Sequence, residues 1–359
     1  MISVLFETHH LYYLPNFLPI IDEMKSRGIY SLSISIPKTI NDTERFYLKK
    51  ISEAKNLEFL DGSSEDSRQR KLRKRKFDVV IVGVPGMLEK IFSDNSLAIM
   101  VYHGIGLKHS YYKDTSHRIN IRAVESEMRY KELKSQGETN LLLTGYTKID
   151  PLFQDHTKLN QKNLEDLNLN SQKKTILYAP TFYPSSIEKL IPYCTEFAKK
   201  YNLIIKLHGF SWNQKRYKHH SIIAEKISGK GIYLVPKEDY NIIPYYSISD
   251  ALISDISSTL FEYLALNRPI FQTTFFTPRL KHRIFKSRLR KRLDLDRSEK
   301  INFTYVLENP HQILLEVKKV LNDNDTLFFH REQALKNFLY QTDGKASSRL
   351  VDAIEDKNK

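Results

Sequence analysis

Three short segments place polar side chains directly after apolar runs that are typical of buried strands. His103 follows LAIMVY, His208 follows LIIKL, and Asp255 follows ALIS. In open α/β sheets, ligands bind beyond the carboxyl ends of the strands, so these side chains are candidates for chemistry. An imidazole, with an unperturbed pKa of about 6.5, can take up a proton near neutral pH. The two histidines therefore indicate proton transfer or stabilisation of phosphate charge.

The segment after Asp255 begins a predicted helix with Ser257, Ser258 and Thr259. Hydroxyl groups and free backbone amides at the positive end of a helix can hold a diphosphate. The simpler interpretation is that these residues only cap the helix, which is the commoner role of Ser or Asp there. A lone histidine is likewise more often a satisfied hydrogen-bonding group. Two strand-end histidines, one in each half of the chain, favour a functional site.

Several other classes of protein are disfavoured by what the sequence lacks. It has no G-x-G-x-x-G, Walker or G-x-S-x-G motif, which argues against dinucleotide-binding, P-loop and serine hydrolase sites. Its single cysteine, Cys194, excludes an internal disulfide and a thiolate-rich metal site, and is consistent with a reducing cytoplasm. The N-terminal residues do not resemble a signal peptide, and no apolar run approaches the ~20 residues that span a bilayer. We expect any membrane contact to be peripheral.

The apolar pattern predicts the elements that position these residues. Runs at 77–83, 96–102 and 139–145 are typical of strands buried on both faces of a parallel sheet. A second series of strands and helices begins after a polar stretch that follows Asp150. The sequence thus predicts an α/β fold with two doubly wound parallel-sheet domains facing a cleft. We expect an N-terminal domain at 1–155, a C-terminal domain at 172–325, and a helical segment at 326–359 that packs back across the cleft.

The chain carries 56 Lys and Arg against 42 Asp and Glu, a net charge of +14. Such an excess favours polyanionic partners. Basic residues cluster at 68–76 and 279–292. These clusters are either solvated surface or a means of holding a soluble enzyme on an anionic membrane, at ~1 kcal/mol for each Lys or Arg near the leaflet. No nucleic-acid-binding motif is present, so we expect no nucleic acid partner.

Six blocks of sequence resemble, in order, the CDP-glycerol glycerophosphotransferases that build teichoic-acid and related polyol-phosphate polymers. The blocks are VYHGIGLKHSYYKD, LLLTGYTKIDPLF, KKTILYAPTFYP, IIKLHG, SDALISDISSTLFEYLALNRPIFQ and DGKASSRLVDAI, between Val101 and Ile354. The resemblance implies a GT-B fold, an acceptor side in the N-terminal domain and a CDP-polyol donor in the C-terminal domain. It also implies a cytoplasmic enzyme attached peripherally to the inner face of the membrane.

The resemblance assigns roles to individual residues. His103 and His208 match the family's two histidines and are the predicted catalytic residues. Ser257 and Ser258 match the paired serines that follow its aspartate, here Asp255. The predicted substrate-binding residues are Gly104, Lys108, Thr181, Lys206, Asp255, Ser257, Ser258, Thr259 and Glu262. The sequence departs from the family at Ile256, at Gly209 and at Tyr146 to Lys148, which leaves the identity of the polyol open.

The expected reaction is attack of an acceptor hydroxyl on the β-phosphorus of a CDP-polyol, with CMP as the leaving group. His103 would remove the proton, while His208, Lys206 and the helix start would stabilise the diphosphate. Glu262 would accept from the ribose hydroxyls. We expect no cofactor and no obligatory metal, because no Asp-x-Asp pair stands at a strand end and positive groups can replace a cation.

Two alternatives remain open from the sequence. One is a GT-B glycosyltransferase or epimerase that uses a UDP-sugar. The other is a non-catalytic basic scaffold in which the strand-end histidines are structural. The acceptor, a glycan or a lipid-linked molecule, the number of units added and the oligomeric state also stay open.

Overall fold

The computed structural model describes residues 1–84, 88–91, 95–106, 116–154, 163–279, 284, 301–322 and 325–358, which form two compact units. Unit 1 comprises the described residues up to Gly104, those of 116–154, and those from Asn337 onward. Unit 2 comprises Ile105, Gly106 and the described residues from 163 to Lys336. The chain therefore returns to unit 1 near its C-terminal end, and the segment 326–359 is divided between the units.

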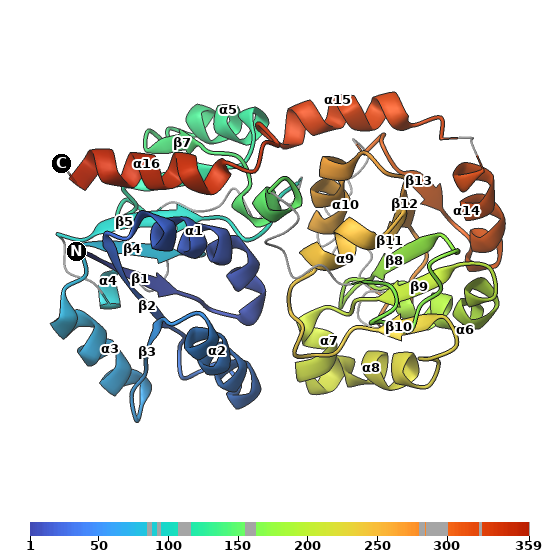
Figure 1. The fold of residues 1–359 in the computed structure, drawn as a ribbon, viewed down its shortest axis with the longest axis horizontal. Helices are drawn as coiled ribbons and strands as arrows, with labels where there is room; N and C mark the ends of the chain where they lie inside the picture. Colours follow the sequence, from blue (N-terminus) through green and yellow to red (C-terminus); the bar gives the residue numbers. More distant parts are fainter. Residues whose placement is uncertain are drawn as a thin grey trace. The chain divides into compact units, whose positions relative to one another are not determined.

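Unit 1 is built on a parallel sheet with the strand order β3-β2-β1-β4-β5-β6-β7 (Figure 1). The strands are β1 (Ile2–Glu7), β2 (Tyr30–Ser35), β3 (Glu58–Leu60), β4 (Val79–Val82), β5 (Leu97–Val101), β6 (Ile121–Val124) and β7 (Leu141–Leu143). Strand order changes direction between β1 and β4, which is where doubly wound sheets bind ligands. The helices are α1 (Leu14–Arg27), α2 (Asp42–Ala54), α3 (Glu65–Arg75), α4 (Leu88–Ile91), α5 (Glu127–Ser135) and α16 (Ala346–Asn358).

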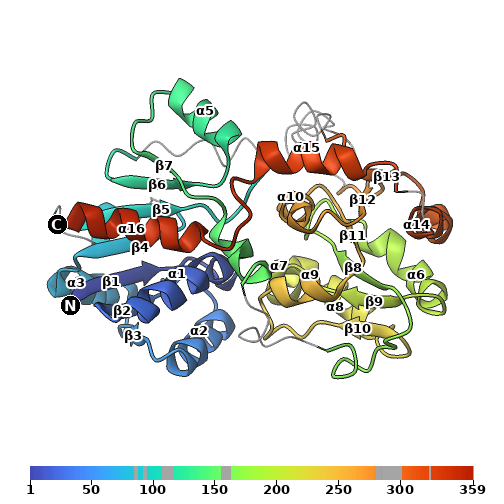
Figure 2. The same cartoon turned by 45° about the horizontal axis from the view of Figure 1, so that its top comes forward.

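Unit 2 repeats this plan with the strand order β10-β9-β8-β11-β12-β13 (Figure 2). The strands are β8 (Thr175–Ala179), β9 (Asn202–Ile205), β10 (Ile232–Leu234), β11 (Ala251–Ser254), β12 (Ile270–Thr273) and β13 (Tyr305–Leu307). The helices are α6 (Ile187–Ala198), α7 (Gly209–Asn213), α8 (Lys218–Glu225), α9 (Ile243–Ile248), α10 (Ser258–Glu262), α14 (Ile313–Leu321) and α15 (Phe328–Phe338). Its switch point lies between β8 and β11.

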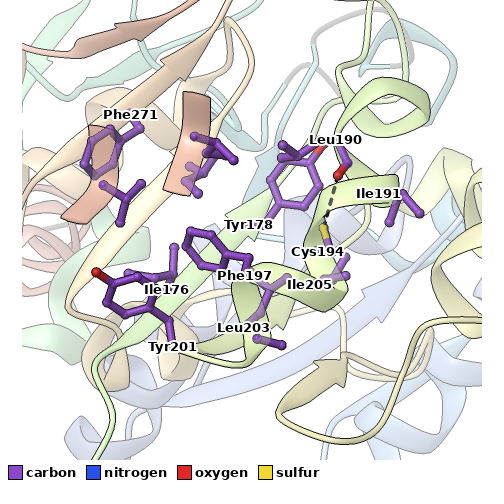
Figure 3. Packing of buried hydrophobic residues seen from close by; sticks show 14 of the residues in the cluster. Ile176, Tyr178, Leu190, Ile191, Cys194, Phe197, Tyr201, Leu203, Ile205 and Phe271 are labelled. Atoms are coloured by element: carbon purple, nitrogen blue, oxygen red, sulfur yellow. Dashed lines mark hydrogen bonds between the residues drawn. The ribbon is translucent and has the colours of Figure 1, made fainter. Parts of the chain in front are cut away.

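The core of unit 2 forms where α6 covers the sheet (Figure 3). Leu190, Cys194 and Phe197 recur at helical spacing on α6 and are buried against residues of β8 and β9. The Cys194 thiol donates to the Leu190 carbonyl at 3.5 Å, and burial raises its pKa to about 12. Cys194 is therefore a packing residue and a poor nucleophile.

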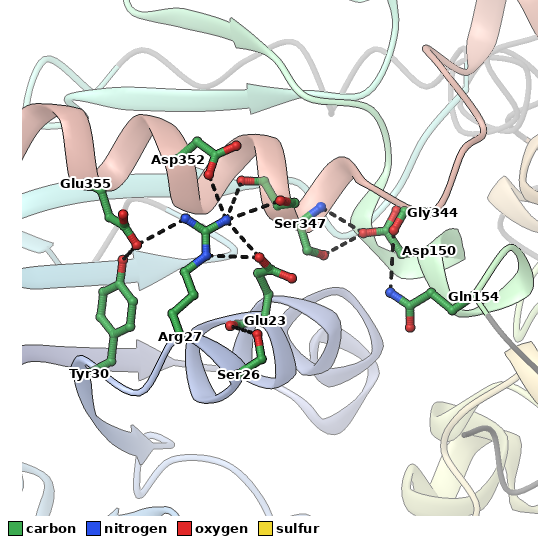
Figure 4. A network of polar contacts seen from close by, with 11 residues as sticks. Glu23, Ser26, Arg27, Tyr30, Asp150, Gln154, Gly344, Ser347, Asp352 and Glu355 are labelled. Carbon is green, nitrogen blue, oxygen red and sulfur yellow. Dashed lines mark hydrogen bonds and ion pairs between the residues drawn. The ribbon is translucent and has the colours of Figure 1, made fainter. Parts of the chain in front are cut away.

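Polar contacts near its start and farther along hold α16 against the rest of unit 1 (Figure 4). At its start, the Asp150 carboxylate accepts from the backbone amides of Ala346 and Ser347, at 3.1 and 2.7 Å. Farther along, the Arg27 guanidinium of α1 pairs with Asp352 and Glu355. Asp150 lies in the block LLLTGYTKIDPLF and the start of α16 in the block DGKASSRLVDAI. The contact between them gives a structural reason for both blocks to occur in one chain.

Two sequence predictions need correction. The run 139–145 contains β7, but its leucines are only half-buried because β7 is an edge strand and has one neighbour. In the basic run 68–76, Arg68 is not on the surface: it is fully buried and pairs with Glu7 at 2.9 Å and with Glu65 at 2.7 Å. The other six Lys and Arg residues of that run are exposed. In the described part of the chain, no helix has the length and apolar character that a bilayer crossing requires.

Candidate active site

His103 lies two residues beyond the end of β5, on the carboxyl side of the unit 1 sheet. Its ring centroid is 4.2 Å from that of Tyr13 and 5.4 Å from that of Tyr12. Its backbone carbonyl accepts from the Tyr146 hydroxyl at 3.2 Å. The half-buried imidazole is thus positioned by aromatic rings from the segment that follows β1 and by a hydroxyl from the segment that follows β7.

Gly83, directly after β4, makes this arrangement possible. A Cβ atom at Gly83 would lie 2.0 Å from Cδ1 of Tyr13, far inside any real contact. Only glycine therefore lets the Tyr13 ring take its place beside His103. The apolar run 77–83 indicates the strand before Gly83, but the sequence carries no signal for this long-range contact.

The end of β1 supplies polar groups that the sequence analysis missed. Glu7 and Thr8 are fully buried, and burial raises the pKa of Glu7 to about 7, although Arg68 opposes the shift. His9 has a buried Nδ1 with no hydrogen-bond partner among the described residues, and burial lowers its pKa to about 4. His9 therefore stays neutral at pH 7. The polar run Glu7-Thr8-His9-His10 comes at the end of an apolar strand. The rule that polar residues directly after such a strand are candidates, which selected His103, could have found it.

Two other predicted residues belong to the segment after His103. Gly104 is buried, and its carbonyl accepts from Arg129 Nη2 at 3.2 Å, while Arg129 Nε bonds to Glu125 at 2.7 Å. The backbone at Gly104 is thus held by a buried ion pair. Lys108 lies outside the described residues.

Asp255 organises the switch point of unit 2. Its Oδ2 accepts from the backbone amide of Thr181 at 2.7 Å and from Thr181 Oγ1 at 3.2 Å. Its Oδ1 accepts from the Ser186 amide at 3.0 Å and from Thr273 Oγ1 at 2.7 Å. Burial raises the pKa of Asp255 against the effect of these donors. Asp255 therefore holds the loop Thr181–Ser186, which joins β8 to α6, to the ends of β11 and β12.

The segment after Asp255 starts α10 as predicted. The Ser257 side chain caps the helix by accepting from the Thr259 amide at 3.4 Å, and Thr259 Oγ1 lies 2.8 Å from Ser254 Oγ. Ser257, Ser258 and Thr259 are half-buried. Glu262 is fully buried, and its Oε2 accepts from the Tyr246 hydroxyl at 2.8 Å. The ribose contact suggested for Glu262 stays a prediction.

His208 lies three residues beyond β9 and caps α7. Its Nδ1 accepts from the Phe210 amide at 3.1 Å, so in the neutral imidazole the proton resides on Nε2. The ring lies 4.8 Å from that of Phe182, next to Thr181. His208, Thr181 and Asp255 are thus brought together through one loop. Lys206 is half-buried directly after β9.

Arg279, from the basic run 279–292, reaches the same loop. Its guanidinium lies 3.9 Å from the ring centroid of Tyr183 and 5.0 Å from that of Tyr217. Its backbone amide donates to the Tyr183 hydroxyl at 3.1 Å. Arg279 therefore differs from a freely solvated surface charge. From the sequence, the run was either solvated surface or a contact with an anionic membrane, and its other basic residues lie outside the described part of the chain.

The two doubly wound sheets define a GT-B-like fold, and solved structures share it. A variant of the wall teichoic acid polymerase TagF superposes with a TM-score of 0.69 at 17% identity, over 99% of this chain and 88% of that chain. A putative UDP-N-acetylglucosamine 2-epimerase from Listeria monocytogenes gives 0.65 at 15% identity, over 100% of this chain and 96% of that one. These likenesses establish the fold.

Sequence comparison establishes the family. The family model described as CDP-Glycerol:Poly(glycerophosphate) glycerophosphotransferase matches residues 91–356, and the chain belongs to this family of transferases. A teichoic acid glycerol-phosphate primase of Bacillus subtilis is 29% identical over 38% of this chain and 34% of its own length. A teichoic acid ribitol-phosphate polymerase of Staphylococcus aureus is 28% identical over 62% of this chain and 38% of its own. This chain matches just over a third of the length of each.

Proposed function

We propose that this protein transfers a glycerol-phosphate or related polyol-phosphate unit from a CDP-polyol to a hydroxyl group of a glycan or lipid-linked acceptor. The acceptor oxygen forms a bond to the β-phosphorus, the bond from that phosphorus to the bridging oxygen breaks, and CMP leaves. The observation that carries the proposal is the family match over residues 91–356, which includes both strand-end histidines. A solved structure of a TagF variant soaked with CDPG adds support, since TagF shares this fold.

In this proposal, unit 2 binds the donor. Because the Phe210 amide donates to Nδ1 of His208, the other ring nitrogen carries the proton, and this Nε2–H is a hydrogen-bond donor. Such a donor can stabilise charge that grows on the diphosphate during transfer. Lys206, Thr181 and the Ser257-Ser258-Thr259 segment add donors, and Asp255 positions the Thr181 loop without using its own carboxylate on the substrate.

Unit 1 supplies the base. His103 takes the proton of the acceptor hydroxyl, a role suited to an imidazole whose ordinary pKa is about 6.5. The aromatic rings of Tyr12 and Tyr13, which contact His103, restrict the orientation of its imidazole. The proposed site requires no metal, and we place the protein on the cytoplasmic face of the membrane through exposed basic residues. That attachment should weaken with salt, because screening acts over ~8 Å at physiological ionic strength.

The epimerase-like fold favours one competing function, the use of a UDP-sugar. A donor panel separates the two. The full chain is incubated with CDP-glycerol, CDP-ribitol and UDP-N-acetylglucosamine together with a hydroxyl acceptor, and nucleotide release is followed by chromatography. The proposal expects CMP from a CDP-polyol only. Release of UDP, or epimerisation of the UDP-sugar without CMP release from any CDP-polyol, would replace it.

A further inference from the structure

A cluster of three metal-ligating side chains lies in unit 2 and plays no part in the proposed transfer. Glu188 stands in the first turn of α6, and His219 and His220 are consecutive residues of α8. Each offers one ligand atom, and these three atoms all lie within 4.8 Å of one another. We propose that Glu188, His219 and His220 form a binding site for a divalent transition-metal ion of the zinc type.

The spacing of the ligand atoms fits such an ion. Glu188 Oε1 lies 3.1 Å from His219 Nε2 and 3.3 Å from His220 Nε2. Tetrahedral zinc with bonds of about 2.0 to 2.1 Å separates neighbouring ligand atoms by about 3.3 Å. An ion can therefore enter between these three atoms with small side-chain rotations. Two imidazoles and a carboxylate are also the ligand types that zinc takes in sites with three protein ligands, where water completes the shell.

The Glu188 carboxylate is incompletely hydrogen-bonded, and a bound cation would satisfy it. Both imidazoles approach the same oxygen of Glu188, whereas Glu188 Oε2 is buried and has no partner among the described residues. One oxygen of this carboxylate is shared by two imidazoles and the other is buried without a described partner, which is unusual for a buried polar atom. An ion held between the nitrogens and the carboxylate would engage both histidines and balance the charge of the Glu188 carboxylate.

A second shell is present as well. His220 is only 2% exposed, and its Nδ1 lies 3.0 Å from Ser211 Oγ of α7. When the hydroxyl accepts from Nδ1–H, the Nε2 lone pair faces Glu188, which is the tautomer that binds a metal. Residues adjacent on a helix do not share a face, so His219 and His220 carry no metal signature in the sequence. The site arises because Glu188 comes from another helix.

The proposed ion would tie together the elements around the donor loop. Glu188 lies two residues after Ser186, whose backbone amide donates to Asp255. On the other side of the cluster, the amide of Ser211 donates to the His208 carbonyl at 2.8 Å. Metal binding should therefore stabilise the arrangement of α6, α7 and α8. The role is structural, and it is independent of the identity of the donor.

The test uses the full chain after removal of metals with a chelator. Zn²⁺ is titrated by calorimetry, Co²⁺ is added to read four-coordinate geometry from its visible absorption, and thermal unfolding is measured with and without Zn²⁺. We expect one equivalent of Zn²⁺ to bind, a higher unfolding temperature, and no competition from Mg²⁺, which prefers six oxygen ligands. Ser211→Ala should weaken Zn²⁺ binding about 10-fold or more, the scale of a lost second-shell bond.

Variants decide the assignment. His219→Ala, at a half-exposed position that tolerates truncation, and Glu188→Gln, which keeps the side-chain shape, should each weaken binding more than Ser211→Ala does. His311→Ala is the matched control. His311 is an exposed histidine whose described hydrogen bond is to the Tyr193 hydroxyl, so it is not one of the three proposed ligands. It should bind Zn²⁺ like the unaltered chain. Absence of one-equivalent binding, or Zn²⁺ affinity in His219→Ala and Glu188→Gln equal to that of the unaltered chain, would overturn the proposal.

Discussion

Replacement of Asp255 by asparagine is the sharpest test of how the donor loop is held. The carboxylate accepts at least four hydrogen bonds, two or more at each oxygen, and each oxygen serves one backbone amide, from Thr181 or from Ser186. Asparagine has one oxygen and one NH₂ group, which cannot accept. Whichever way it is oriented, one buried backbone N–H then faces a donor and has lost its acceptor.

The expected magnitude follows from that count. A buried donor without an acceptor costs about 1 to 3 kcal/mol, and bonds to a charged acceptor are worth more than neutral ones. We expect the free energy of unfolding to fall by about 2 to 3 kcal/mol in Asp255→Asn. The Thr181 loop should loosen, so donor affinity should fall by at least ~10-fold, equivalent to about 1.4 kcal/mol.

The assay combines urea unfolding with calorimetric titration of CDP-glycerol. Asp250→Asn is the matched control. Asp250 precedes β11, the strand that Asp255 follows, and its carboxylate accepts from the Thr175 amide at 2.8 Å. Unlike Asp255, its side chain is 37% exposed. This control should lose less than about 1 kcal/mol and keep its donor affinity, since an asparagine oxygen can keep that bond. Equal stability of Asp255→Asn and the unaltered chain would refute the description of Asp255 as the residue that holds the loop.

Two further predictions concern unit 1. Because His9 has a pKa of about 4 in the folded chain, the unfolded chain takes up a proton that the folded chain does not as the pH falls from about 6.5 to about 4. Between about pH 7 and pH 5, the unaltered chain should lose about 2 kcal/mol more stability than His9→Asn in urea unfolding, and parallel pH profiles would contradict this. Gly83→Ala must displace Tyr13, so it should cost about 1 to 3 kcal/mol and slow turnover while donor binding stays normal. Unchanged turnover would show that the Tyr13 contact does not position His103.

The sequence predicted the fold well because both sheets are parallel and buried. Strands such as β4 and β5 are continuous apolar runs, and His103, His208 and Asp255 follow strands, at the carboxyl ends where open α/β sheets bind ligands. Local signals also hold: α1 ends before Gly28, whose φ of 71° is a left-handed conformation that glycine adopts readily.

The parts that the sequence did not predict depend on contacts between distant residues. The burial of Arg68 requires Glu7, 61 positions away, and a run of basic residues gives no sign of such a partner. The edge position of β7 follows from strand order, which apolar content does not encode. The cluster of Glu188 with His219 and His220 joins two helices, and Arg279 packs on Tyr183 from 96 positions away. Each case is decided by tertiary packing.

The division of labour between the two histidines is the central claim of the proposed function. Calorimetric titration of CDP-glycerol, paired with steady-state turnover, tests it directly on His103→Ala and His208→Ala. We expect His103→Ala to bind the donor almost normally and to turn over at least ~100-fold more slowly, the scale of a lost general base. His208→Ala should lose both donor affinity and turnover. Near-normal turnover of His103→Ala, or a loss of donor affinity in His103→Ala but not in His208→Ala, would contradict the assignment.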